Sequence, residues 1–248
     1  AFVGKLYRPL LAKAGFNPAQ GAYAGEEPEA SQRRAQYVGQ LSGTARDAAV
    51  RGKLAGAAKA WLAGDKAALD PSWYGAAFGA WLAAEDRIEG GGLLAAKKLY
   101  GAALASTDPL FRPSALGVVA RSGKADIARW VLEDARDKRL RLSERLSLVM
   151  GVAVSGRTRD MGYDWMRDHS DEMLSGGAGI FLGARLPQVF AGYCSVAKAD
   201  AILKDFAPKL AGKTGELELA RTVERVRSCG VLKEKRAVEV SAQIARLK

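Results

Sequence analysis

The sequence predicts an all-α protein, a HEAT/armadillo-like helical-repeat array in which antiparallel helix pairs stack into a curved solenoid. Apolar residues recur at helical spacing along most of the chain, and alternating runs of valine, isoleucine and threonine are scarce. Asp70-Pro71 and Asp108-Pro109 each place an N-cap acceptor before a proline at the first helical position. Their spacing of 38 residues suits stacked helix pairs, and we expect at least seven helices.

Three segments show the helical period most clearly. They cover residues 125–137, 141–154 and 199–210. Their apolar stripes are Ile127, Trp130, Val131 and Ala135; Leu142, Leu146, Val149, Met150 and Ala153; and Ala199, Ile202, Leu203 and Phe206. Each stripe places its members on one face of a helix, and Pro208 is expected to end the third pattern.

Short polar or glycine-rich stretches separate these segments. The stretch "GAYAGEEPEAS", residues 21–31, is expected to form a loop with Glu26, Glu27 and Glu29 solvated. Gly90 to Gly92 lack the G-x-x-x-x-G-K-[ST] frame of a phosphate-binding loop and predict a helix-to-helix turn. The five tryptophans mostly fall in apolar stripes, so core packing is the better interpretation for them.

The net charge narrows the classes of partner. Lysine and arginine number 38 against 27 acidic residues, which gives +11. Such a surplus suits nucleic acid, an acidic partner or a carboxylate ligand, but the cations are spread along the chain, so nucleic acid is unlikely. No apolar run reaches the roughly 20 residues that span a bilayer. Cys194 and Cys229 can form at most one disulfide or stay reduced.

The sequence contains no recognisable catalytic constellation and no metal-binding motif. His169, in "YDWMRDHSDEML", is the one histidine of the chain. A zinc helix of the H-E-x-x-H kind needs two histidines four residues apart, so that both nitrogens reach one ion. Nothing in the sequence near Cys194 or Cys229 suggests an activated nucleophile. We interpret His169 as part of one exposed turn of a structural helix.

Several motifs resemble the C-terminal helical domain of aminopeptidase-N-like (gluzincin) zinc aminopeptidases, as in the endoplasmic-reticulum aminopeptidases. "TDPLFRPSALG" resembles the family pattern D-P-x-x-R-x-x-x-L-G, "YDWMRDHSDEML" a tryptophan-rich family segment, and "ERVRSCGVLK" the closing helices. The matching residues are Asp108, Pro109, Arg112, Leu116 and Gly117; Tyr163, Asp164, Trp165, Met166 and Asp171; and Glu224, Arg225, Val226, Arg227 and Lys233. Tyr74 and Ser170 depart from the residues common in the family.

The resemblance covers the chain from about Leu6 to its end. It implies that residues 1–248 are a single C-terminal helical-repeat domain of a larger aminopeptidase, which removes N-terminal residues from peptides. In the family, zinc is held by an H-E-x-x-H helix and a distant glutamate in a preceding catalytic domain, and a G-A-M-E-N segment binds the substrate's amino group. These motifs do not occur here, so we expect an inert fragment without a cofactor of its own. Its role would be a lid over the active site that forms the peptide chamber. The implied partners are the upstream catalytic domain and a peptide substrate.

Four basic residues are candidates for pairing with a peptide's C-terminal carboxylate. Arg112, Arg121, Lys124 and Arg185 lie in or beside expected turns or helix starts. Arg185 precedes an apolar stripe formed by Leu186, Val189, Phe190 and Tyr193. The alternative function, from another class, is a free-standing helical-repeat protein that binds nucleic acid or an acidic protein. We expect a soluble protein of the cytoplasm or periplasm.

Overall fold

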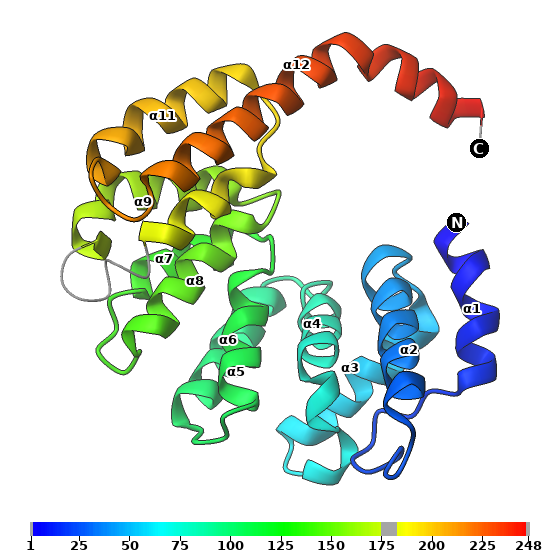
Figure 1. Cartoon of the computed structure of the whole chain (residues 1–248). Helices are drawn as coiled ribbons and strands as arrows, with labels where there is room; N and C mark the ends of the chain where they lie inside the picture. Colours follow the sequence, from blue (N-terminus) through cyan, green and yellow to red (C-terminus); the bar gives the residue numbers. More distant parts are fainter. Residues whose placement is uncertain (1, 175–182, 247–248) are drawn as a thin grey trace. The chain divides into compact units, whose positions relative to one another are not determined.

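The computed structural model describes residues 2–174 and 183–246, and every regular element in these ranges is a helix (Figure 1). The prediction of an all-α chain is therefore confirmed. The chain divides into two compact units. Unit 1 comprises Ala1–Ser122 and Arg136–Glu144, and unit 2 comprises Gly123–Ala135 and Arg145–Lys248. The curved array and the single domain over 1–248 stay predictions, because the positions of the two units relative to each other are not determined.

Unit 1 is built from helices that pack in neighbouring pairs. Its α-helices are α1 (Phe2–Ala14), α2 (Pro28–Gly39), α3 (Ala48–Leu62), α4 (Tyr74–Glu85), α5 (Gly91–Ala105) and α6 (Phe111–Ala120). Shorter turns are the π-helix η1 (Gln40–Thr44) and the 3₁₀ turns η2 (Lys66–Ala68) and η3 (Pro71–Trp73). α1 packs on α2, α3 on α4, and α5 on α6, while α4 also contacts α6.

An aromatic cluster joins the α3–α4 pair to α6. The ring centroid of Trp61 lies 4.4 Å from that of Phe111 and 5.4 Å from that of Tyr74. Phe78 and Phe111 are 5.3 Å apart in an edge-to-face arrangement. All four side chains are buried, and aromatic pairs of this geometry add to the free energy gained from burial. Trp73 and Trp81 are buried as well, which confirms the core interpretation for them.

The helix starts follow the capping logic of the sequence. Asp70 accepts a hydrogen bond from the backbone N–H of Ser72 at 3.0 Å, with Pro71 at the first position of the turn that leads into α4. Asp108 accepts from the N–H groups of Leu110 at 2.8 Å and Phe111 at 3.1 Å. These caps satisfy donors that have no partner within the helix. The predicted start at Asp70 is confirmed, whereas α6 begins at Phe111, two residues after Pro109, with Leu110 at its N-cap position.

The expectation of a solvated loop over 21–31 is wrong in part. α2 begins at Pro28, inside that range, and Glu26 forms an ion pair with the buried guanidinium of Arg34. Arg34 also donates to the backbone carbonyls of Ala14 at 2.9 Å and Gly15 at 3.0 Å. A buried arginine needs such partners, so Glu26 is drawn inward to neutralise it. The hydrogen bond from Arg34 lowers the pKa of Glu26.

Unit 2 also consists of packed helices. They are α7 (Ala125–Asp134), α8 (Leu142–Val154, whose first residues belong to unit 1), α9 (Arg159–Leu174), η4 (Leu186–Gly192), α11 (Val196–Leu210) and α12 (Glu216–Arg246). α9 contacts α7 and α11, and α12 packs on α11 and η4. Tyr163, Phe190 and Phe206 form its aromatic core, with Phe190 and Phe206 centroids 4.7 Å apart. The stripe after Arg185 is buried as expected.

Two details of α8 and α11 correct the sequence-based expectations. Pro208 lies inside α11, which continues to Leu210. A proline in the last turn removes a single backbone hydrogen bond, and the helix tolerates this when Leu210 is buried in the core. Leu142 and Leu203 are exposed although they belong to predicted apolar stripes.

A disulfide links two parts of unit 2. Cys194, just before α11, pairs with Cys229 on α12, and the two residues lie 35 apart in the sequence. The sequence left this pairing open, and the structure shows it. Among the described helices, none is both long enough and apolar enough to cross a membrane.

Candidate functional site

Arg112, the first of the four candidate basic residues, is held by contacts inside unit 1. Its Nε donates to Glu144 Oε1 at 2.6 Å, and its Nη2 donates to Glu144 Oε2 at 2.9 Å. The backbone carbonyls of Leu104 and Arg139 accept its other donors at 2.9 and 3.0 Å. The exposed fractions of the Arg112 and Glu144 side chains are 13% and 12%. This bidentate pair ties the start of α6 to the start of α8.

The other three candidates occupy helix ends. Arg121 is the C-cap of α6 and is exposed, at the opposite end of that helix from Arg112. Lys124 is the N-cap of α7 and is half-buried. Arg185 immediately precedes η4 and is exposed. Arg112 and Arg121 belong to unit 1, and Lys124 and Arg185 to unit 2, so the four are not shown to share one face. Their role in binding a carboxylate stays a prediction.

His169 has a structural environment in α9. Its Nδ1 lies 2.8 Å from the backbone carbonyl oxygen of Trp165, and its ring stacks on the indole of Trp165 with centroids 4.3 Å apart. These contacts fix the imidazole against its own helix. Within the described residues, no group of three or more His, Cys, Asp or Glu side chains is arranged to hold a metal ion.

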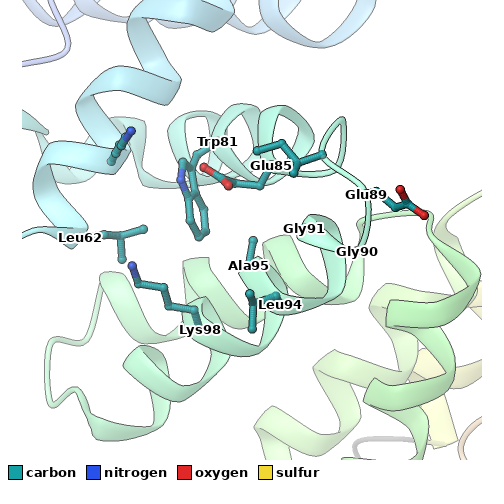
Figure 2. A pocket seen from close by; sticks show the side chains of 11 residues that line it. Leu62, Trp81, Glu85, Glu89, Gly90, Gly91, Leu94, Ala95 and Lys98 are labelled. Atoms are coloured by element: carbon teal, nitrogen blue, oxygen red, sulfur yellow. The ribbon is translucent and has the colours of Figure 1, made fainter.

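The cavity that stands out in unit 1 lies between α3, α4, α5 and the turn joining the last two (Figure 2). Its volume is about 470 Å³. α5 contributes Gly91, Leu94, Ala95 and Lys98, which lie on one helix face because their spacing is three, four and seven. On the α4 side, Trp81 and Glu85 lie one helical turn apart, and Ile88 follows in the turn after α4. Lys59 and Leu62, from the end of α3, complete the wall.

The turn at one end of the cavity depends on glycine. Gly90 has a φ of 69°, in the left-handed region that glycine adopts without strain. A Cβ on Gly91 would stand 2.5 Å from the backbone oxygen of Glu85, so the start of α5 could not approach the end of α4 this closely with a side chain there. The predicted helix-to-helix turn is present and ends at Gly90, while Gly91 and Gly92 already belong to α5; this turn positions the cavity wall.

The cavity combines an apolar floor with charges of both signs. Trp81 and Ala95 are buried, whereas Leu94 is 72% exposed and Ile88 is 62% exposed. The charged lining residues are Lys59, Lys98, Glu85 and Glu89. Within the described part of the chain, none of these four side chains forms an ion pair or a side-chain hydrogen bond. The indole N–H of Trp81 is likewise without a partner there. The site is therefore an open, apolar cleft with unpaired donors and acceptors.

A second cavity of about 400 Å³ lies where α1 meets η1 and α3. Its principal charged groups already pair with each other, since Arg8 Nε donates to Asp47 Oδ2 at 2.6 Å. The side chain of Asp47 also accepts from the N–H groups of Ala49 and Val50, which makes it the N-cap of α3. The hydrogen bond from Arg8 is the main cause that lowers the pKa of Asp47. We interpret this cavity as part of the attachment of α1.

The sequence did not single out the first cavity. Its lysines and glutamates have the spacing of ordinary surface residues, and in "EGGGLLAAKKLY" only the glycines carried a structural prediction. One usable signal was present. Leu94 and Lys98 follow Gly91 on one face of α5, next to a turn whose glycines allow close helix packing.

The described residues form an all-helical fold of neighbouring helix pairs with a mixed-charge cleft, which places the chain in the all-α class of helix-pair domains. The model of the ERAP1-like C-terminal domain family matches residues 1–228, and the chain therefore belongs to this family. The resemblance inferred from the motifs is confirmed. This membership suggests a domain of an aminopeptidase. The search of curated proteins finds no match to the chain.

The family match ends within α12. That helix continues to Arg246, and every described residue after Gly230 is exposed. Figure 1 shows the end of α12, coloured red, extending past α11 within unit 2.

Proposed function

We propose that the chain is the non-catalytic C-terminal domain of a zinc metallo-aminopeptidase. In this role it covers the active site of an upstream catalytic domain in the same polypeptide and forms the chamber that holds the peptide substrate. The family match over residues 1–228 is the observation that carries the proposal. Zinc and the catalytic groups would come from the catalytic domain, and the parent enzyme would remove N-terminal residues from peptides.

The arrangement of helices supports a covering role. Paired helices supply a broad surface from few loops, and a curved array of such pairs would enclose a space while excluding bulk water. The net charge of +11 supports attraction of peptide carboxylates toward that space.

Among the four candidate residues, Arg121 and Arg185 are the better candidates for a peptide's C-terminal carboxylate. Both are exposed, and a guanidinium can pair with a carboxylate through two parallel hydrogen bonds. Arg112 already has its donors engaged by Glu144 and two carbonyls, so a substrate contact there would compete with internal bonds. Lys124 is half-buried and remains a weaker candidate.

The test uses the whole enzyme and peptide pairs that differ only in a free-acid or amide C-terminus. Arg121→Gln or Arg185→Gln should weaken use of the free acid by on the order of 1–2 kcal/mol in kcat/KM and leave the amide unchanged. Arg225→Gln, an exposed arginine on α12, is the matched control. Equal effects on acid and amide at both positions would contradict carboxylate pairing.

A covering role itself is tested by peptide length. Deleting residues 1–248 from the whole enzyme should abolish its discrimination between peptides of different length and preserve cleavage of a small aminoacyl chromophore. Length discrimination that persists after the deletion would contradict the chamber.

The alternative is a free-standing helical-repeat protein that binds nucleic acid or an acidic protein. The net charge of +11 and the sequence pI near 9.7 favour it. It predicts tight, salt-sensitive binding of a DNA or RNA duplex by the purified chain, with affinity falling steeply from 50 to 200 mM salt. Absence of such binding, with a gluzincin domain in the same polypeptide, would exclude it.

The disulfide bears on the compartment. Cys194 and Cys229 form a disulfide within unit 2, and such bonds persist in oxidising compartments. We therefore propose the periplasm or another oxidising compartment over the cytoplasm.

A further inference from the structure

The cleft between α3, α4 and α5 has the features of a small-ligand site that the covering role does not use. Its volume of about 470 Å³ falls within the roughly 300–1,000 Å³ of small-molecule sites. Leu94 and Ile88 expose large apolar side chains at its edge, next to the buried indole of Trp81. Apolar side chains gathered beside a concave surface are typical of binding sites rather than of a solvated helix face.

The charges around the cleft are separated by sign. Lys59 and Lys98 supply positive charge from α3 and α5, and Glu85 supplies negative charge from α4. In Figure 2 the amino group of Lys98 lies near Leu62, while the carboxylate of Glu85 lies beside Trp81. The side chain of Glu89 lies beyond Gly90, away from the indole.

These charges also lack partners within the chain. No side-chain ion pair involves Lys59, Lys98 or Glu85 in the described residues. A ligand with both an ammonium and a carboxylate would give each of them a charge-assisted hydrogen bond. A simple carboxylate would meet repulsion from Glu85, and an uncharged apolar ligand would leave all three charges partly desolvated and unpaired. Charge complementarity thus selects a zwitterion.

We propose that this cleft binds an unblocked peptide of two or three residues that carries an apolar side chain. The peptide carboxylate pairs with Lys59 and Lys98, its ammonium pairs with Glu85, and its side chain packs against Trp81. This binding does not rest on the covering role, because the cleft lies within unit 1 and the test uses this chain alone.

The test measures binding of L-leucyl-L-phenylalanine to the purified chain by isothermal titration calorimetry. The N-acetyl and C-terminal amide forms of the same dipeptide serve as ligands that each lack one charge. We expect the free dipeptide to bind and each blocked form to bind about tenfold more weakly, as for the loss of one charge-assisted hydrogen bond. No heat from any form up to about 10 mM, or equal affinity of all three, would overturn the proposal.

Variants assign each end of the peptide. Lys98→Gln should weaken binding of the free dipeptide about tenfold and reduce the difference between acid and amide, part of which Lys59 still maintains. Glu85→Gln should remove the difference between the free and acetylated forms. Lys53→Gln is the matched control, since this exposed lysine lies on α3 but lines the other cavity. Retained affinity and discrimination in both cleft variants, with native circular dichroism spectra, would also overturn the proposal.

Discussion

The guanidinium of Arg112 has four acceptors around it: two oxygens of Glu144 and the carbonyl oxygens of Leu104 and Arg139. Both charged side chains are largely buried, and removal of one partner would leave the other charge with little solvation. The hydrogen bond from Arg112 is the main cause that lowers the pKa of Glu144. At the residue scale, this pair is a structural connection between α6 and α8.

Glu144→Gln should therefore lower the free energy of unfolding at pH 7 by about 2–4 kcal/mol. Because the folded pKa of Glu144 lies below its ordinary value of 4.5, the pair contributes fully above that value. The contribution is lost as the pH falls through the folded pKa, so the difference between variant and wild type should shrink progressively as the pH falls below 4.5. Urea unfolding at pH 7 and at an acidic pH well below 4.5 measures this.

Glu133→Gln is the control for this experiment, because Glu133 is exposed on α7. It should change stability by less than about 0.5 kcal/mol at either pH. A Glu144→Gln variant as stable as the wild type at pH 7, or equally deficient at both pH values, would contradict a buried ion pair.

At the scale of elements, the Cys194–Cys229 disulfide holds α12 to the segment that begins α11. Glycine allows the same approach, because a Cβ on Gly230 would stand 2.7 Å from the backbone nitrogen of Val196. α11 and α12 also pack along their length. The disulfide and the close packing at Gly230 therefore both hold α12 against the start of α11.

Loss of the disulfide should destabilise the chain. In the loop-entropy account, a disulfide that joins residues 35 apart lowers the entropy of the unfolded chain. This stabilises the folded state by about 3–4 kcal/mol. The Cys194→Ser/Cys229→Ser variant should unfold at lower urea concentration than the wild type and show no response to reductant. The wild type should shift toward the variant when reduced. A wild type indifferent to reductant, together with full stability of the double variant, would refute this role.

The elements differ in how far the sequence could predict them. Helical stripes and Asp-Pro caps are local, so the start at Asp70 and the capping hydrogen bonds of Asp108 followed from a few neighbouring residues. Contacts between distant residues leave no such signal. Arg112 and Glu144 are 32 residues apart, and neither residue type nor spacing pointed to their pairing.

The cleft was hidden from the sequence for the same reason. Its three helices each contribute an unremarkable set of residues, and the site exists only where α3, α4 and α5 meet. Arg112 fits the family pattern, and its place in the structure accounts for that residue by packing between helices rather than by an open substrate contact.

At the scale of the whole molecule, the curved array of helix pairs is still a prediction. A compact globular chain of this length has a radius of gyration of about 18 Å. Small-angle X-ray scattering of the purified chain should give more than about 20 Å if the helix pairs stack into an open array. A value near 18 Å would indicate a closed bundle and contradict the array.

We propose that this chain serves an aminopeptidase without carrying its catalytic centre. The most direct measurement is metal analysis of the purified chain combined with an assay of aminoacyl chromophore release. One histidine and the missing H-E-x-x-H pair predict no stoichiometric zinc and no release above background. About one zinc per chain together with chelator-sensitive release of the chromophore would contradict the account.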